Sequence, residues 1–266
     1  MSQMLPSDWG KDPVSDYIEH ANRNTHATFS NLRGVFKHLA EIGKVFNALS
    51  KNLNFVQTPM APAFVIRTYS LYLAAVRLST SGQIPETYIV LRACLENSLY
   101  AHYIHAHPKL AVPWLNREVD QPSKKVVRDE FAAGRVLKCL EQADAETGKI
   151  ARALYERTIT YGAHPNPYSI LSQTRISEDG PTVTESLGYL ECGTPPHVMC
   201  MKTCAEVGLC CLHVFNRVFP ERFKILGLWE SVLQLRDPRH FGQYKKALKQ
   251  CQQAASQAKG TPEADA

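Results

Sequence analysis

An arginine and a histidine near the end of one helical pattern are the residues of this sequence best suited to acid–base chemistry on a charged substrate. Arg157 and His164 are seven residues apart, and seven steps of 100° return almost to the starting face of an α-helix. A guanidinium stays charged and binds phosphate oxygens, whereas an imidazole exchanges protons near neutral pH. Held together, the two groups would suit cleavage of an RNA phosphodiester without a metal, because the imidazole moves a proton and the guanidinium offsets charge at the phosphate.

The same two residues also allow a purely structural interpretation. Helical side chains lean toward the N-terminus, so Arg157 points away from His164, and the rise between them is about 10 Å. Within one chain the arginine would pair with Glu130, Glu156 or another carboxylate, and the histidine would cap the end of its helix. Two copies of the helix would bring the groups closer, so the catalytic interpretation implies a homodimer.

Arg92, Glu96 and Tyr161 are the candidate supporting residues. Arg92 and Glu96 lie one turn apart on an otherwise apolar helix. This spacing favours either a simple intrahelical ion pair or a partly buried pair that orients Arg157 or His164. Tyr161 lies three residues before His164 and would help to orient it.

Hydrophobic residues spaced three and four apart predict an all-α fold, a multi-helix bundle. Asp12 and Pro13 are typical of a helix start, and one long N-terminal helix is expected over 14–53. The helical period disappears over 168–190, where a short β-hairpin or a structured loop is expected. We predict a flexible leader over 1–13, a single helical domain over 14–250 and a flexible tail over 251–266. Further helices are expected at 58–79, 85–105, 123–142, 144–164, 195–219, 221–235 and 238–257.

Two sets of residues have metal-binding side chains without the spacing of a metal site. His102, His105 and His107 fall on different faces of one helix end. In the second set no paired CxxC spacing occurs, and cysteines buried among apolar residues would explain why thiols recur on one side of a helix. Its members are Cys192, His197, Cys200 and Cys204. We predict no metal and no cofactor, and zinc at the second set stays an open alternative.

Composition limits the class of protein. The 266 residues are 44% hydrophobic, enough for one large core, and the net charge of +5 permits contact with polyanions without requiring it. Arg67 and Arg77 interrupt the most apolar stretch, 63–78, and no charged-then-apolar leader opens the chain. Eight cysteines scattered through helix-like segments fit reduced thiols. We therefore predict a cytoplasmic protein with no membrane association.

One stretch near the C-terminus is notably basic. Basic side chains on a helix are usually a solvated face, and the alternative is a track for a phosphate backbone. The residues are Arg236, Arg239, His240, Lys245, Lys246 and Lys249, beside Phe241 and Tyr244.

Several short motifs resemble those of one all-helical superfamily. They are Arg157 and His164 near the end of a closing helix, Ser81-Gly-Gln-Ile-Pro85, Leu91-Arg92-x-x-Leu95-Glu96, and Tyr161-x-x-His164-Pro165. Together they cover about 30–220 and resemble the HEPN superfamily (higher eukaryotes and prokaryotes nucleotide-binding). Within it, they are most similar to an uncharacterised bacterial branch that resembles abortive-infection and toxin-type proteins.

The resemblance implies a metal-independent endoribonuclease or an RNA-binding defence or toxin component, dimeric in either case. Arg157 would hold phosphate and His164 would act as general acid or base. The alternative is a non-catalytic helical scaffold, in which a carboxylate occupies Arg157 and His164 lies away from any cleft. A small zinc protein built on the cysteines is a third alternative.

Overall fold

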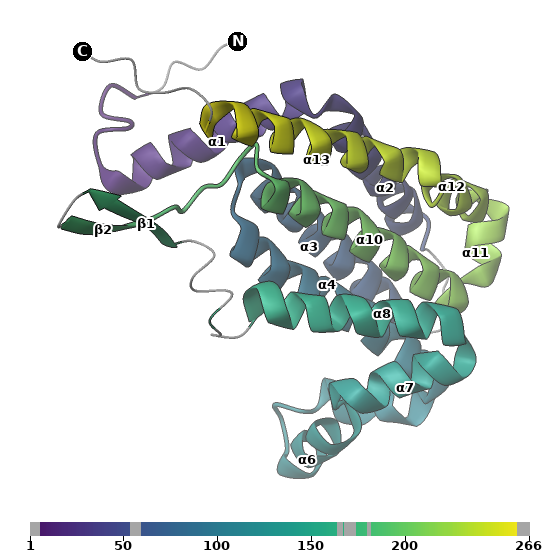
Figure 1. The fold of residues 1–266 in the computed structure, drawn as a ribbon. Helices are drawn as coiled ribbons and strands as arrows, with labels where there is room; N and C mark the ends of the chain where they lie inside the picture. The colour runs from purple at the N-terminus through teal and green to yellow at the C-terminus, as the bar shows by residue number, and fades with distance from the viewer. Residues whose placement is uncertain (1–5, 54–59, 164–166, 168–173, 180–181, 260–266) are drawn as a thin grey trace.

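The computed structural model describes residues 6–53, 60–163, 167, 174–179 and 182–259. These residues form a bundle of packed helices, so the predicted all-α fold is confirmed (Figure 1). Most helices begin where the sequence supplies a cap or a proline. Asp12 accepts hydrogen bonds from the amides of Val14 and Ser15, and Asp144 accepts one from the amide of Thr147.

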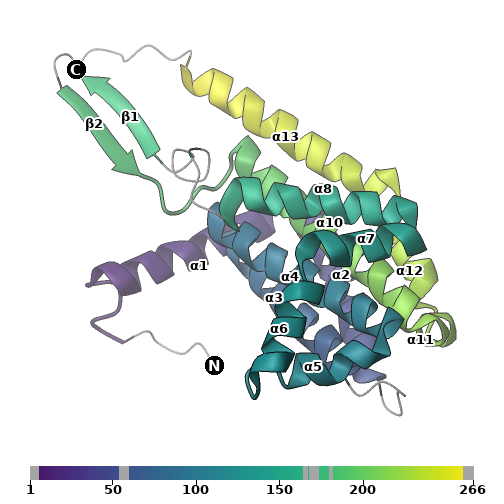
Figure 2. The same ribbon diagram turned by 90° about the horizontal axis from the view of Figure 1, so that it is seen from below.

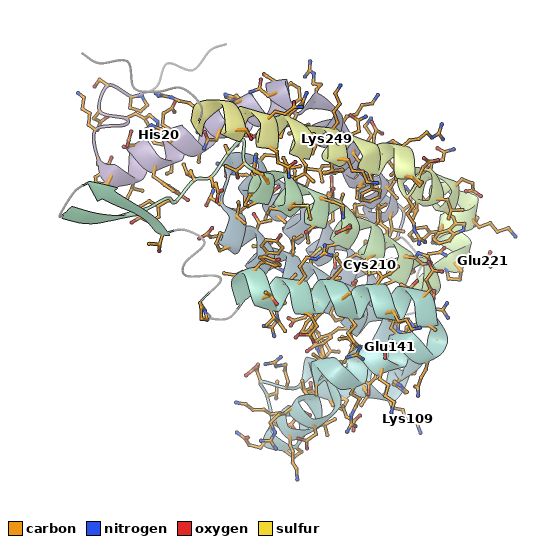
Figure 3. All side chains as sticks on the ribbon, in the orientation of Figure 1. His20, Lys109, Glu141, Cys210, Glu221 and Lys249 are labelled. Carbon is orange, nitrogen blue, oxygen red and sulfur yellow. The ribbon has the colours of Figure 1, made fainter. Side chains whose placement is uncertain are left out.

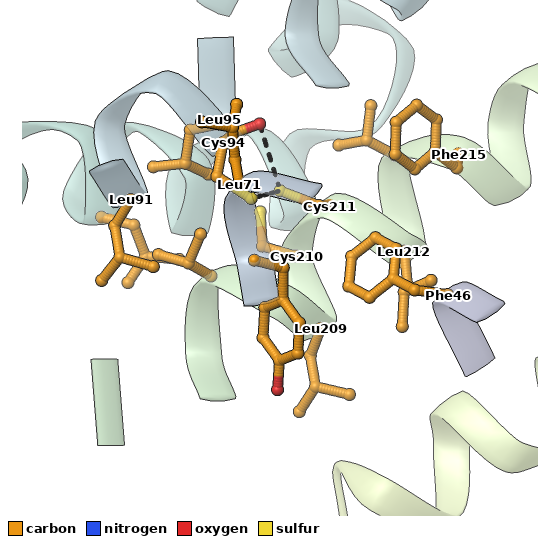
Figure 4. Close-up of a cluster of buried hydrophobic side chains, with 14 of the residues drawn as sticks. Phe46, Leu71, Leu91, Cys94, Leu95, Leu209, Cys210, Cys211, Leu212 and Phe215 are labelled. Carbon is orange, nitrogen blue, oxygen red and sulfur yellow. Dashed lines mark hydrogen bonds between the residues drawn. The ribbon is translucent and has the colours of Figure 1, made fainter. Parts of the chain in front are cut away.

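The centre of the bundle is the helix α10 (Pro195–Val218), which most of the other long helices contact. These are α2 (Arg33–Lys51), α3 (Ala61–Ser81), α4 (Ile84–Ala106), α8 (Ala145–Thr158) and α13 (Pro238–Lys259). Figure 1 shows α10 between α8 and α13, with α3 and α4 behind it. Figure 4 shows side chains of this core, in which Cys94 and Cys211 lie among leucines and phenylalanines. Burial of this apolar surface is the main stabilising term of the fold.

Among the described residues, α10 is the helix long and apolar enough to cross a membrane by length and composition, with a mean hydropathy of 1.5. The expectation that 63–78 is the most apolar stretch is therefore wrong. The helices around α10 bury 78% of its most apolar window, which is usual for the core helix of a bundle.

The predicted N-terminal helix over 14–53 is wrong in one respect, because it is two helices. α1 (Pro13–Asn31) and α2 meet at Leu32, whose φ of −115° and ψ of 40° are not helical. The two helices have different partners: Thr28 donates to the carbonyl of Thr80 at the end of α3, whereas α2 buries its apolar side in the core. A three-and-four spacing continues across the junction, so the apolar pattern alone cannot reveal the change of direction.

Two other predicted helices are also divided. The stretch 123–142 contains α6 (Gln121–Glu130) and α7 (Ala133–Ala143), which separate where the buried Phe131 packs against Tyr100. The stretch 221–235 contains α11 (Pro220–Ile225) and α12 (Leu228–Leu235), which separate at Gly227 with a φ of 60°. The short helices η1 (Pro108–Leu110) and α5 (Ala111–Leu115) connect α4 to α6.

The helices α7 and α8 pack closely against each other. An added Cβ at Gly148 would come within 2.5 Å of the Glu141 Cα, so glycine permits this approach. Arg152 of α8 donates to both carboxylate oxygens of Glu141, at 2.6 and 3.0 Å, and Figure 3 labels Glu141 in this region. This packing fixes the orientation of α8, which carries Arg157.

Two antiparallel strands lie between α8 and α10 in the chain. β1 (Thr174–Asp179) pairs with β2 (Thr182–Leu187), and Thr174 is opposite Leu187. Figures 1 and 2 both place the hairpin outside the bundle, at the end where α1 also leaves it. Just after β2, Tyr189 meets Tyr17 of α1 edge to face, with ring centroids 6.4 Å apart.

Turns precede α1 at one end of the described chain, and the helix α13 forms the other end. Residues 6–12 form turns, and the Gly10 amide donates to the Ser15 hydroxyl, so this part of the leader is held against α1. α13 continues to Lys259, and Cys251 packs against the core. The stretches 1–5 and 260–266 lie outside the described residues.

Candidate functional site

The helix that carries Arg157 does not continue as a regular α-helix. After Thr158 the chain forms a π-helical turn, η2 (Ile159–Ala163). The hydroxyl of Thr158 donates to the carbonyl of Tyr155 at 2.6 Å, and that of Thr160 donates to the carbonyl of Glu156 at 3.0 Å. Such bonds and the β-branched side chains disfavour a regular α-turn. The 100° step that put Arg157 and His164 on one face therefore does not apply across η2.

Gly162 lets η2 lie directly on the start of α4. An added Cβ there would lie 2.3 Å from the carbonyl oxygen of Pro85 and 2.9 Å from the Cβ of Tyr88. The close approach stacks Tyr161 on Tyr88, with ring centroids 5.2 Å apart and an interplanar angle of 27°. Tyr88 is buried, which raises its pKa, whereas Tyr161 is half-buried.

Arg157 is held on α10 by a carboxylate. Its guanidinium donates to Glu206 at 2.5 Å and lies 3.4 Å from the hydroxyl of Thr203. Lys202 bonds the second oxygen of Glu206, and its ammonium lies 5.8 Å from the ring centroid of Phe241. Since one carboxylate is shared by two cations, this cluster keeps a net positive charge.

Arg157 and Thr203 of this cluster line a pocket of about 900 Å³, and the acidic residue Glu191 also lines it. Its other walls are the start of α4, η2 and the start of α10, and the lining residues include Ile84, Pro85, Tyr88, Arg157, Tyr161 and Thr203. The pocket thus combines aromatic and apolar surface with a guanidinium. An exposed aromatic face can stack a nucleobase, and a guanidinium can hold a phosphate, so the chemistry suits one nucleotide of a single strand.

Arg92 and Glu96 form a second cluster, with Tyr155. Glu96 accepts from Arg92 at 2.9 Å and from the Tyr155 hydroxyl at 3.2 Å, and Arg92 also donates to that hydroxyl at 2.9 Å. Tyr155 and Arg157 are two residues apart on α8, so they point in nearly opposite directions. Arg92 and Glu96 thus fix α8 to α4, whereas Arg157 pairs with Glu206 on α10.

The predicted site residue His164 lies outside the described residues. The scaffold interpretation expected a carboxylate at Arg157, and Glu206 is that carboxylate. The two acids first considered have other roles: Glu130 pairs with Arg135, and Glu156 accepts at its carbonyl from Thr160.

The four residues considered for zinc form two pairs: the Cys192 sulfur lies 3.9 Å from Nε2 of His197, and Cys200 is next to Cys204 in the core. His197 accepts from the Gly193 amide at Nδ1 and bonds the Ser79 carbonyl through Nε2, which occupies both ring nitrogens. Burial lowers the pKa of His197 to about 4 and raises that of Cys192 to about 11. Cys200 and Cys204 are fully buried and face backbone carbonyls. In the part of the chain that the structure describes, no group of three or more His, Cys, Asp or Glu is arranged to hold a metal ion.

The other histidines and the basic C-terminal stretch lie away from the pocket. His102 is buried, His105 is exposed, and His107 lies edge-on to Tyr103. Of the basic residues, Arg236 pairs with Glu146 and Arg239 with Asp237. Lys245, Lys246 and Lys249 are exposed on α13, and Figure 3 labels Lys249 there.

Sequence reasoning identified Arg157 and Tyr161 but missed Tyr88, Lys202, Thr203 and Glu206. One available signal was the i,i+4 pair Lys202 and Glu206, two charges one turn apart on an otherwise apolar helix. Arg92 and Glu96 on α4 have the same i,i+4 spacing. Comparison with protein-family models, with curated proteins and with solved structures finds no match for this chain.

Proposed function

We propose that this chain is a HEPN-like protein that binds RNA in the pocket beside Arg157. The observation that carries the proposal is that the guanidinium of Arg157 and the stacked pair Tyr88 and Tyr161 line one pocket of about 900 Å³. A base would contact the half-buried face of Tyr161, and a phosphate would exchange with Glu206 at Arg157. Lys202 would keep Glu206 neutralised after the exchange.

The proposal extends to cleavage without a metal. His164 follows η2 directly in the chain, and there it would take the proton of a 2′-OH or supply one to the leaving 5′-oxygen. The 2′-oxygen attacks phosphorus, the bond from phosphorus to the 5′-oxygen breaks, and Arg157 stabilises the charge on the phosphate. We propose a cytoplasmic homodimer, in which two copies contribute to the paired sites.

The test is incubation of the purified full chain with single-stranded RNA in EDTA. We expect cleavage by the wild type and loss of cleavage in His164→Ala, while both proteins bind the RNA and melt at the same temperature. Equal cleavage by both proteins would identify a contaminating nuclease and remove the catalytic proposal. Binding without cleavage in the wild type would leave only the RNA-binding proposal standing.

A non-catalytic helical scaffold is the second candidate, and the ion pair between Arg157 and Glu206 favours it. In that case Arg157 serves only to hold α8 against α10, and the pocket receives a segment of a protein partner. The scaffold predicts that RNA binds neither the wild type nor any variant of the pocket. Measurable affinity for RNA that depends on Arg157 would exclude it.

A further inference from the structure

A second cleft, of about 650 Å³, lies near the other end of α4, where Tyr100 packs against Phe131 at the end of α6. Its lining residues include four basic side chains and two aromatic ones, and no acidic side chain of a described residue lines it. They are Arg117, Lys124, Lys125, Arg128, Tyr100 and Phe131. Tyr88 and Tyr100 are twelve residues apart on α4, about 18 Å along the helix, so this cleft is separate from the pocket beside Arg157.

The basic side chains of α6 face the cleft because of their spacing. Gln121, Lys124, Lys125 and Arg128 recur at three and four residues and form one stripe of the helix. The buried residue of α6 is Val127, which anchors the helix. Phe131 ends α6 and packs on Tyr100 with ring centroids 5.0 Å apart, while the Tyr100 hydroxyl donates to the Phe131 carbonyl. The stripe is therefore held beside an aromatic wall.

Nearby carboxylates leave the four cations available. Among the described residues, Arg117 and Arg128 pair only with their sequence neighbours Glu118 and Asp129, and such exposed pairs are weak. Lys124 and Lys125 are exposed and form no ion pair with a described residue.

The two remaining acids of this region are occupied by other groups. Asp120 caps α6 through Ser123, and Glu130 binds Arg135 and Tyr103 outside the cleft. An anion entering the cleft would therefore displace only the two weak pairs.

We propose that this cleft binds a compact polyphosphate carried by a nucleoside. The four cations lie within twelve residues of sequence, on one helix and the turn before it, which suits phosphates that are clustered. The cleft has the volume of a small-molecule site, whereas a nucleic acid strand would need a basic track that continues beyond it. The wall formed by Tyr100 and Phe131 offers apolar contact to the base.

The test measures binding of ATP, tripolyphosphate and AMP to the purified full chain by calorimetry. We expect ATP to bind most tightly, tripolyphosphate less tightly, and AMP at least about tenfold more weakly than ATP, because AMP lacks the clustered charge. Lys124→Glu with Lys125→Glu should weaken ATP binding at least about tenfold. The matched control is Lys245→Glu with Lys246→Glu, an adjacent exposed lysine pair on α13, which should leave ATP binding unchanged.

Several results would overturn the proposal. The first is that neither ATP nor tripolyphosphate binds. The second is that the charge reversals on α6 and on α13 weaken ATP binding equally. The third is that AMP binds as tightly as ATP. If tripolyphosphate binds as tightly as ATP, the nucleoside does not contribute to binding, and that part of the proposal is wrong. Single-stranded RNA that displaces ATP and loses affinity in the Lys124 and Lys125 variant would reassign the cleft to nucleic acid. If the Lys124→Glu, Lys125→Glu protein melts at a lower temperature than the wild type, Lys124→Gln with Lys125→Gln provides the same comparison with a smaller change of charge.

Discussion

The guanidinium of Arg157 belongs both to the packing of α8 on α10 and to the wall of the pocket. It is 31% exposed, so it can meet a ligand without leaving its position, and its carboxylate partner Glu206 already has a second cation in Lys202. A phosphate that took the place of Glu206 at Arg157 would leave no isolated buried charge. This arrangement differs from an ordinary ion pair, in which removing one partner leaves the other charge without a counterion.

Three buried histidines make stability depend on pH. Burial lowers the pKa of His38, His102 and His197 to about 4, from an ordinary value of 6.5. Between pH 6.5 and pH 4 the unfolded chain binds protons that the folded chain excludes. The free energy of unfolding should therefore fall as the pH is lowered through this window, by up to about 1.4 kcal/mol per pH unit for each histidine.

His102→Leu isolates one of these contributions. His102 is buried on α4 and its Nδ1 has no hydrogen-bond partner in the described part of the chain, so leucine removes both a proton-linked penalty and an unsatisfied polar atom. We expect the variant to be more stable than the wild type at pH 5, by roughly 1 kcal/mol or more, and to show a shallower pH dependence. Urea unfolding at pH 7 and pH 5 measures both quantities.

The control for this substitution is His105→Leu, on the exposed side of the same helix. The loss of stability between pH 7 and pH 5 should persist in this variant, because His102 stays buried. A His102→Leu protein that loses stability as steeply as the wild type between pH 7 and pH 5 would contradict the account of His102.

The residue types at the pocket were more predictable than their partners. Arg157 and Tyr161 were recognisable because their side chains suit phosphate and base. Glu206 was not recognisable as the partner of Arg157, since it lies 49 residues further along the chain and its spacing to Lys202 indicates only an intrahelical ion pair. Which acid meets a given arginine depends on how two helices are placed, and helical periodicity does not specify that placement.

At the scale of elements, the position of η2 depends on a glycine. Gly162→Ala would place a methyl group against the Pro85 carbonyl and Tyr88, so η2 must move away from α4. We expect a loss of roughly 1–3 kcal/mol in the free energy of unfolding, together with weaker RNA binding because Tyr161 moves with η2. Chemical denaturation and a binding titration measure the two effects.

Gly242→Ala is the matched control, because a Cβ at this position of α13 meets nothing within 4 Å. Alanine there should raise the free energy of unfolding by roughly 0.5–1 kcal/mol, because it restricts the unfolded chain and favours the helix. If both substitutions change stability in the same direction, the close approach of η2 to α4 is not what positions this turn.

Helices were predictable from the sequence, whereas their interruptions were not. Periodicity indicated helical structure at both sides of Leu32 and of Phe131, yet the chain changes direction at both places. At Leu32 no proline marks the break, and α1 and α2 contact different parts of α3: Thr28 of α1 donates to the Thr80 carbonyl, whereas Tyr72 donates to the Leu39 carbonyl of α2. The π-helical turn η2 was likewise hidden, since its residues suit a helix end and the shift appears only through Thr158, Thr160 and the contact at Gly162.

At the scale of the whole molecule, one apolar core encloses most of the thiols. Five cysteines are buried, and Cys94 and Cys211 lie with their sulfur atoms 4.0 Å apart between α4 and α10 (Figure 4). Burial raises the pKa of Cys200 and Cys210 well above the ordinary value, which keeps them as unreactive thiols. The core therefore uses cysteine as a small apolar residue.

Thiol counting tests this packing. Native protein treated with a chromogenic disulfide reagent should react quickly at no more than three cysteines, which are Cys139, Cys192 and Cys251. In denaturant all eight should react. Rapid reaction of more than three thiols in the native protein would mean that the core around α10 opens in solution. Bound zinc in the reduced protein would contradict the assignment of both ring nitrogens of His197 to backbone partners.

Binding of a short single-stranded RNA by Arg157→Gln and by Glu206→Gln is the most direct test of the central claim that Arg157 serves a ligand. Both variants break the same ion pair, so a purely structural role predicts that both change affinity alike or not at all. A phosphate site predicts opposite signs: Arg157→Gln should bind about tenfold more weakly, and Glu206→Gln should bind more tightly because the competing carboxylate is gone. Affinities measured by fluorescence anisotropy at fixed salt that stay equal across the wild type and both variants would contradict the account.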